Sequence, residues 1–317
     1  MRLKHSIFLA RTKCEVWKVT YCCGSVARMN TPVKRIANLI QADADEHTYL
    51  IVPESAITPG FTSEKVELLT PARFLTELDK HMAGLAFAEA AIRAEKEGFS
   101  AAILNAYGDY GIQTLRSVTR IPIVGAGQAS MQAAMALGRQ FGIVTVWPPL
   151  TAPTYARLIA ENGVQSRFTG IRFVISDAEL PGQLAKGSLG LTLRDAPETL
   201  IDRIEREARE LLDNGADVIL IGCVCMCPIQ PELERRLGVP VIDPLLAAHA
   251  HAEMLVRLGH QRATPPVADD RLEFLRAMLV GGSVQIATTG LSEDALCGDS
   301  CEILSAVDAA GLTSGET

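Results

Sequence analysis

The sequence predicts an α/β protein of two pseudo-symmetric lobes, each a mainly parallel sheet flanked by helices, with the site in the cleft between them. Two observations lead to this prediction. From Val33 onward, short runs of β-branched residues alternate with helical stretches, which is the pattern of parallel sheets covered by helices. The sequence also repeats itself, because residues 98–113 align without a gap with residues 215–230. A chain built from two similar units follows from that repeat.

The expected strands and helices follow one another along the chain. β-branched and apolar runs predict strands at 33–40, 66–69, 100–105, 121–124, 141–146, 171–175, 217–222 and 239–242. Helical patterns occupy 81–97, 111–118, 127–140, 151–162, 196–213, 229–237 and 244–258. The helix at 196–213 is the clearest, because one of its faces is an apolar stripe and the other carries Glu, Arg and Asp. Asn214 and Gly215 end it in the manner of a left-handed cap.

The internal repeat also locates the expected site. After one inserted residue, 121–134 aligns with 239–252, so each copy contains a helix, a strand, a loop, a helix, an X-Pro strand and a helix. Ligands of open parallel sheets bind beyond the carboxyl ends of the strands. Two similar lobes that face one another would therefore bring the strand-end loops 105–111 and 222–228 to a single cleft.

The chain is expected to divide into four parts. These are a disordered extension at 1–32, a first lobe at 33–135 completed by 243–260, a second lobe at 136–242, and a C-terminal extension at 261–317. Residues 1–28 carry six Lys or Arg against the single acid Glu15 and show no apolar periodicity. An alternative is that the protein starts at Met29. The C-terminal extension is expected to hold one helix at 269–280 and a loosely ordered tail.

Composition excludes several classes of function. The net charge of -7 gives no electrostatic support to a nucleic-acid or anionic-membrane partner. Apolar runs stay well short of the roughly 20 residues that cross a bilayer. Eight cysteines are too few and too clustered for a disulfide scaffold in a chain of 317 residues, and three of them follow one buried strand. We therefore expect thiols in a reducing, cytoplasmic setting.

Two segments resemble a known family. Residues 216–226 (ADVILIGCVCM), followed by LGVPVIDP, resemble the second catalytic segment of the aspartate/glutamate/hydantoin racemase superfamily. Residues 103–111 (ILNAYGDYG), followed by RIPIVGAGQAS, resemble the first catalytic segment. Residues 141–163 resemble the strand and helix that close the first half, and the resemblance covers about 33–260.

The resemblance implies a cofactor-independent enzyme that moves a proton at a carbon next to a carboxylate or hydantoin-like carbonyl. Inverting such a carbon needs a base on one face and an acid on the other, and two thiols can supply both. Cys223 is the predicted catalytic thiol. The predicted substrate-binding residues are Gln41, Ala106, Tyr107, Gly108, Asp109, Thr145, Val224 and Cys225. No cofactor and no metal are implied, and the resemblance suggests a homo-oligomer that binds a small substrate.

Ala106 departs from this scheme, because the repeat aligns it with Cys223 and a methyl group transfers no proton. Three explanations stay open. The enzyme uses one thiol, as arylmalonate decarboxylases do; Tyr107 or Asp109 acts on the opposite face; or Ala106 replaces a natural cysteine. Three functions likewise stay open: a racemase-family isomerase, a single-cysteine lyase and a non-catalytic small-acid binding protein.

Other side chains near the two loops have a simpler interpretation. Cys225 and Cys227 are interpreted as small residues that alternate along an extended segment. Asp243 is interpreted as the N-cap of a helix. Gln128 either caps a helix or contacts a substrate amine. His249 and His251 lie two residues apart on a predicted helix and so face different directions, which disfavours a shared metal site.

Overall fold

The computed structural model describes residues 33–41, 52–72, 74–184, 196–263 and 267–288. The folded unit begins at Val33. The predicted N-terminal extension and the predicted tail after residue 288 lie outside the described residues. Within the described ranges, none of the helices is both long enough and apolar enough to cross a membrane.

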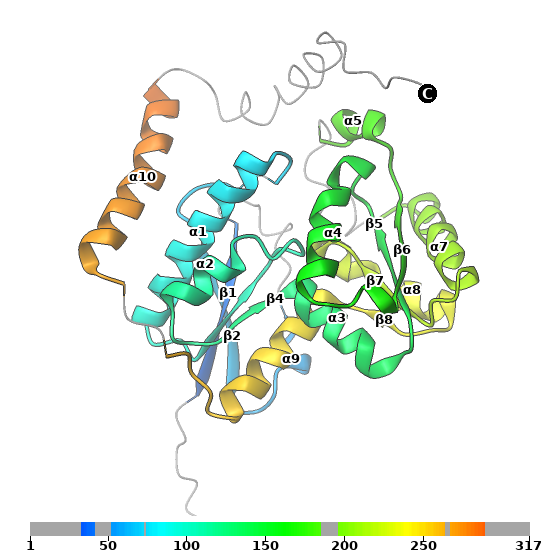
Figure 1. The fold of residues 1–317 in the computed structure, drawn as a ribbon, viewed down its shortest axis with the longest axis horizontal. Helices are drawn as coiled ribbons and strands as arrows, with labels where there is room; N and C mark the ends of the chain where they lie inside the picture. The colour runs from blue at the N-terminus through cyan, green and yellow to red at the C-terminus, as the bar shows by residue number, and fades with distance from the viewer. Residues whose placement is uncertain (1–32, 42–51, 73, 185–195, 264–266, 289–317) are drawn as a thin grey trace, which may run out of the picture. The chain divides into compact units, whose positions relative to one another are not determined.

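The first sheet is parallel and has the strand order β2-β1-β3-β4 (Figure 1). Its strands are β1 (Lys34–Ile40), β2 (Phe61–Glu67), β3 (Ala101–Leu104) and β4 (Ile123–Gly125). Its helices are α1 (Glu77–Lys96), α2 (Ile112–Val118), α3 (Ala126–Leu137) and α9 (Pro244–Arg257). All four residues of β3 are buried, as expected for a strand covered on both faces. Helix α9 packs on α3, β3 and β4, so the chain returns to this sheet after the second one.

The second sheet repeats that arrangement with the order β6-β5-β7-β8, again parallel. Its strands are β5 (Phe141–Thr145), β6 (Phe168–Phe173), β7 (Val218–Ile221) and β8 (Val241–Ile242). The helices between them are α4 (Ala152–Glu161), α5 (Leu180–Leu184), α7 (Glu198–Asp213) and α8 (Gln230–Leu237). In each sheet the second strand in sequence lies at the edge, followed by the first, third and fourth. The predicted fold class of two similar parallel sheets flanked by helices is confirmed.

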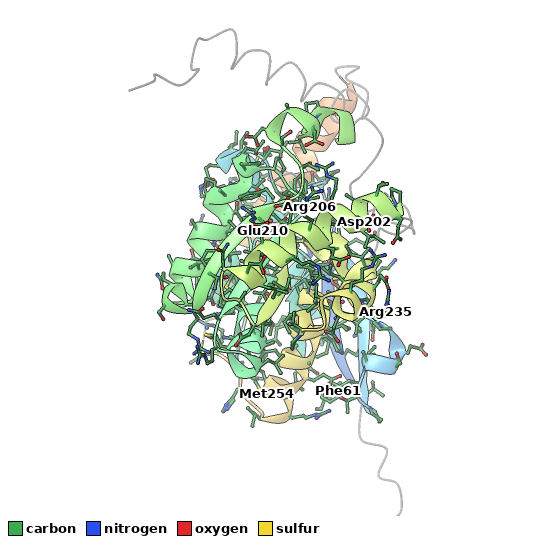
Figure 2. All side chains as sticks on the ribbon, turned by 90° about the vertical axis from the view of Figure 1, so that its right-hand side faces the viewer. Phe61, Asp202, Arg206, Glu210, Arg235 and Met254 are labelled. Atoms are coloured by element: carbon green, nitrogen blue, oxygen red, sulfur yellow. A yellow bond between two sulfur atoms is a disulfide. The ribbon has the colours of Figure 1, made fainter. Side chains whose placement is uncertain are left out.

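Helix α7 shows how the pattern builds the second half. Ile204, Ala208 and Leu211 are buried, while charged residues of the opposite face point away from the sheet (Figure 2). After Asn214, Gly215 has a φ of 95°, and the Ala216 amide donates to the Leu211 carbonyl. This is the expected left-handed cap, which glycine adopts without steric cost.

Several boundaries differ from the predictions, those of β2, α1 and α10 among them. Strand β2 begins at Phe61 rather than at 66, because it is an edge strand whose half-exposed FTSEKVE sequence lacks an apolar run. Helix α1 begins at Glu77 rather than at 81. A capping box explains that start, since Thr76 Oγ1 accepts from the Asp79 amide and the Asp79 carboxylate accepts from the Thr76 amide. Helix α10 (Asp269–Thr288) extends past the predicted end at 280.

Helix α10 packs against α1. Leu272 is 2% exposed and Leu279 is 9% exposed, so one face of the helix is buried. The Arg276 guanidinium reaches the fully buried Glu89 carboxylate of α1 at 2.8 Å. The helical part of the C-terminal extension therefore belongs to the folded unit through both apolar contact and an ion pair.

Candidate functional site

Strand registers place the predicted site residues at the carboxyl ends of the strands. Leu39 pairs with Leu104, so Gln41 and Ala106 both follow neighbouring strands of the first sheet. Val144 pairs with Ile221, so Thr145 lies beside Gly222 at the end of β7 in the second sheet. Parallel strands bring these residues to one edge of their respective sheets, where the predicted loops 105–111 and 222–228 begin.

Cys223 follows β7 and is 8% exposed. It is the N-cap of a 3-10 helix, η5 (Val224–Ile229), and its Sγ accepts a hydrogen bond from the Cys225 amide at 3.2 Å. An amide that donates to sulfur favours the thiolate over the thiol. The Cys223 sulfur thus has one of the contacts that a reactive thiol requires.

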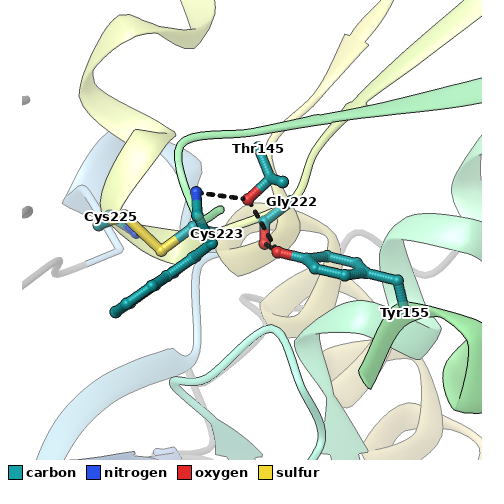
Figure 3. Close-up of a disulfide and its surroundings, with 6 residues drawn as sticks. Thr145, Tyr155, Gly222, Cys223 and Cys225 are labelled. Carbon is teal, nitrogen blue, oxygen red and sulfur yellow. Dashed lines mark hydrogen bonds between the residues drawn. A yellow bond between two sulfur atoms is a disulfide. The ribbon is translucent and has the colours of Figure 1, made fainter. Parts of the chain in front are cut away.

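Cys223 and Cys225 are joined by a disulfide (Figure 3). The expectation of thiols at this strand end is therefore wrong for these two residues, although Cys227 is free. The expectation of an extended segment is also wrong. The chain turns into η5 directly after Cys223, with the Met226 amide donating to the Cys223 carbonyl, and this turn brings the second cysteine back toward the first.

A buried hydrogen-bond network holds the residue before Cys223. Tyr155 Oη of α4 donates to the Gly222 carbonyl at 2.8 Å and lies 2.8 Å from Thr145 Oγ1 (Figure 3). The Trp147 amide donates to the same threonine oxygen at 3.3 Å. Burial raises the pKa of Tyr155 well above its usual value, which keeps the phenol a neutral donor.

Gly222 is required here by close packing. A Cβ at this position would lie 2.9 Å from both Ile143 Cγ2 and Thr145 Cβ, and 3.1 Å from the Tyr155 ring. The sequence predicts Thr145 as a site residue but not Tyr155. The only local signal for Tyr155 is that it is an aromatic residue with a hydroxyl group in the helix that follows β5.

The first loop reaches the same network through Tyr107. Ala106 and Tyr107 are 6% and 5% exposed, and the Tyr107 ring lies 5.8 Å from the Tyr155 ring, centroid to centroid. Tyr155 thus contacts the loop after β3 as well as the residue before Cys223. In addition, Val224 packs against a core cluster built from the first sheet and its helices. The structure therefore brings parts of both predicted loops to one region.

Asp109 is 1% exposed and has a positive φ of 47°. Its carboxylate accepts from the Gly127 amide at 3.0 Å and from the Gln128 amide at 2.7 Å, at the start of α3. Burial raises the pKa of this carboxyl from 3.8 to about 7, and the two amides oppose that rise. Both carboxylate oxygens are thus bound to the protein, and Asp109 fastens the loop to α3.

The remaining predicted residues have these positions. Gly108 is buried and its carbonyl accepts from the Arg157 guanidinium of α4, while Gln41 is half-buried. Asp243 caps α9 by accepting from the Leu245 and Leu246 amides, as its sequence position suggested. The Gln128 side chain instead accepts from Arg116.

The profile of the family described as Asp/Glu/Hydantoin racemase matches residues 33–252. The chain belongs to this racemase family. The match spans both sheets and includes the strand ends that carry Ala106 and Cys223. Membership indicates an activity of racemase or isomerase type.

Individual relatives agree with the family. A hydantoin racemase of Pseudomonas sp. (strain NS671) is 30% identical over 190 residues, which cover 60% of this chain and 71% of that protein. A hydantoin racemase of Paenarthrobacter aurescens is 29% identical over 194 residues, covering 60% and 76%. The allantoin racemase from Klebsiella pneumoniae superposes with a TM-score of 0.62 at 23% identity, covering 74% of this chain and 95% of that one. This structural likeness shows the shared racemase fold.

In the part of this racemase-family chain that the structure describes, no three His, Cys, Asp or Glu side chains gather as metal ligands. His249 lies within α9, where its Nε2 is 3.2 Å from the Glu253 carboxylate. Two surface hollows are present elsewhere, one beside α1 and Gly111, the other beside Arg116 and His260. None of the predicted site residues lines either hollow.

Proposed function

We propose that this racemase-family protein is a cofactor-independent isomerase that moves a proton at the stereocentre beside a carbonyl of a hydantoin-like ring. In this proposal, reduced Cys223 is the acid–base group on one face of that carbon. The observation that carries it is the position of Cys223, at the end of β7 with the Cys225 amide on its sulfur. The similarity to two hydantoin racemases supports the choice of substrate class.

The chemistry needs a thiolate and a site for the negative charge that develops. The thiolate takes the proton from the stereocentre, and the electron pair moves onto the neighbouring carbonyl oxygen. Main-chain amides at the starts of the two loops, those of Tyr107 and Val224, are the candidate donors to that oxygen, since fixed donors stabilise a developing oxyanion. Tyr155 and Thr145 act as positioning residues, because they hold Gly222 and thereby the start of the second loop.

Ala106 leaves the opposite face without a thiol. Of the two other candidates for that face, Asp109 has both carboxylate oxygens bound to α3 amides, which favours Tyr107. Burial raises the pKa of Tyr107, so its phenol would serve as a proton donor rather than as a base. Proton removal by Cys223 followed by donation from Tyr107 would invert the stereocentre, after which solvent returns a proton to the Tyr107 phenolate and takes one from the Cys223 thiol.

The test uses enantiopure 5-substituted hydantoins, with the protein kept under dithiothreitol. In deuterated solvent, nuclear magnetic resonance follows exchange at the stereocentre and chiral chromatography follows inversion. We expect enzyme-dependent exchange that Cys223→Ser slows by at least ~100-fold, equivalent to about 3 kcal/mol in the barrier, the lower limit for a lost general acid or base. Cys227→Ser is the matched control and should retain the rate. Full activity in Cys223→Ser would refute the assignment of this thiol.

The single thiol also favours a second function, a decarboxylase of arylmalonate type. Such a lyase needs to protonate an enediolate from one face only, which one cysteine can do. Release of carbon dioxide from an aryl-methylmalonate, with one product enantiomer, would support this function over the isomerase. If neither substrate class turns over but small acids raise the melting temperature, the protein is a small-acid binding protein.

A further inference from the structure

The second cysteine of the Cys223-Val224-Cys225 segment is placed to react with the first. Their Cα atoms are 5.2 Å apart, which lies within the usual range for disulfides, and their sulfurs are paired in the structure. Cys225 is half-exposed, whereas Cys223 is 8% exposed. The pair therefore combines a sheltered sulfur at the strand end with a neighbour that solvent reaches.

The third cysteine of the segment differs from the other two. Cys227 Sγ donates a hydrogen bond to the Asp243 carboxylate at 3.1 Å. Burial and this carboxylate both raise the pKa of Cys227 well above its usual value, which keeps the group a thiol. Thiols react with oxidants and disulfides as thiolates. Cys227 is consequently a poor competitor for Cys223, although it lies only two residues beyond Cys225.

We propose that Cys223 and Cys225 form a reversible oxidation site, with a hydroperoxide as oxidant and Cys225 as the resolving cysteine. The Cys223 thiolate attacks the peroxide O–O bond, which gives a sulfenic acid and an alkoxide or hydroxide. The proton that the thiol lost on ionisation then converts this leaving group to an alcohol or water. The Cys225 thiol then attacks the sulfenic sulfur, forms the S–S bond and releases water. Overall, two thiols lose two hydrogens and the peroxide is reduced.

The site has a consequence for activity that rests on the proposed function of Cys223. A sulfur in a disulfide neither accepts nor donates a proton, so the oxidised protein is inactive until a dithiol reduces it. The pair also protects Cys223, because capture of the sulfenic acid by Cys225 prevents its further oxidation to sulfinic acid, which dithiols do not reverse. In a reducing compartment the dithiol is the resting form.

Mass spectrometry tests the oxidation site without any substrate. The full chain is reduced, treated with hydrogen peroxide, blocked with iodoacetamide and digested with trypsin. The tryptic peptide 210–235 contains all three cysteines of the segment. We expect this peptide to be lighter by two hydrogens and to carry one carbamidomethyl group, on Cys227. Dithiothreitol before blocking should restore three blocked cysteines. Pairing that includes Cys227, or sulfinic acid on Cys223 in the wild-type protein, would overturn the proposal.

Variants at two positions separate the oxidation site from the catalytic proposal. Cys227→Ser should still form the disulfide, whereas Cys225→Ser and Cys225→Ala should accumulate sulfinic acid on Cys223. Each protein is then compared with its own activity before peroxide. Wild-type and Cys227→Ser should regain most of that activity with dithiothreitol, and the Cys225 variants should stay inactivated. If the disulfide forms but no racemase activity exists, the proposed function fails while the oxidation site stands.

Discussion

At the residue scale, the contacts of Tyr155 are the most informative of the candidate site. Its hydroxyl serves two partners, Thr145 and the carbonyl of Gly222, and its ring lies against Tyr107. One side chain of α4 therefore fixes the residue that precedes Cys223 and also contacts the loop that follows β3. Substitutions here should affect stability and catalysis together.

Tyr155→Phe removes only the hydroxyl and leaves the ring packing in place. We expect the free energy of unfolding to fall by about 1–3 kcal/mol, because buried oxygens lose a partner. Urea unfolding measures this change, and the rate of solvent exchange at a hydantoin stereocentre should fall with it. In a cycle with Thr145→Val, the two losses should not add, since both side chains belong to one network. Strict additivity would show that the two side chains do not interact energetically.

The pH dependence of stability should carry the signature of Asp109. Its folded pKa of about 7 lies above the 3.8 expected without burial, so the folded state binds the proton more tightly than the unfolded state. The contribution of Asp109 to the free energy of unfolding is therefore greatest below about pH 4 and falls as the pH rises to about 7. At 1.36 kcal/mol per pKa unit, the total fall is up to ~4 kcal/mol. The charges of Arg157 and Arg116 oppose the shift and limit this loss.

Thermal unfolding of the wild type and of Asp109→Asn between pH 4 and pH 8 measures the effect. The difference in melting temperature between the two proteins should change across this range, because the amide side chain does not titrate. The melting temperature of the wild type, relative to that of Asp109→Asn, should be highest near pH 4. A difference that stays constant with pH would mean that Asp109 keeps its charge in the fold, held by the Gly127 and Gln128 amides.

At the element scale, α10 offers a matched pair of substitutions. Leu272 is buried against the rest of the fold, whereas Phe274 on the same helix is 62% exposed. Leu272→Ala should lower the free energy of unfolding by about 2–4 kcal/mol, while Phe274→Ala should stay within about 0.5 kcal/mol. Chemical denaturation of both variants checks this. Equal effects would mean that α10 is not packed through its Leu272 face.

The elements also show why some boundaries were predictable and others were not. Helix α7 has a strong apolar stripe and a glycine cap, so its ends can be predicted from the local sequence. Strand β2 lies at a sheet edge and pairs only with β1, so its sequence carries no continuous apolar run. The extended segment expected after Cys223 is instead the 3-10 helix η5, because a turn closes between Cys223 and Met226.

At the scale of the whole molecule, the similarity of the two halves predicts what a second thiol, placed in the first half, would do. Ala106 follows β3 as Cys223 follows β7, and it is 6% exposed in a well-packed loop. Ala106→Cys adds one sulfur atom, a small increase in volume. We expect this variant to racemise a hydantoin faster than the wild type does, because a thiol then faces the stereocentre from each side. Chiral chromatography in both directions measures the change, with Ala106→Ser as the control of similar size. An unchanged rate of racemisation in Ala106→Cys would contradict a shared site between the two loops.

The sequence by itself determined the two similar parallel sheets, the racemase-family resemblance and the position of Cys223 after a buried strand. These depend on apolar periodicity, caps and a repeat, which are properties of neighbouring residues. Only the tertiary structure decided that Tyr155 holds Gly222, 67 residues further along the chain, and that the Asp109 carboxylate is bound to the start of α3. It also decided the pairing of Cys223 with Cys225. Such contacts arise when packed elements exclude water and buried polar groups must find partners, and no local pattern records which partner they find.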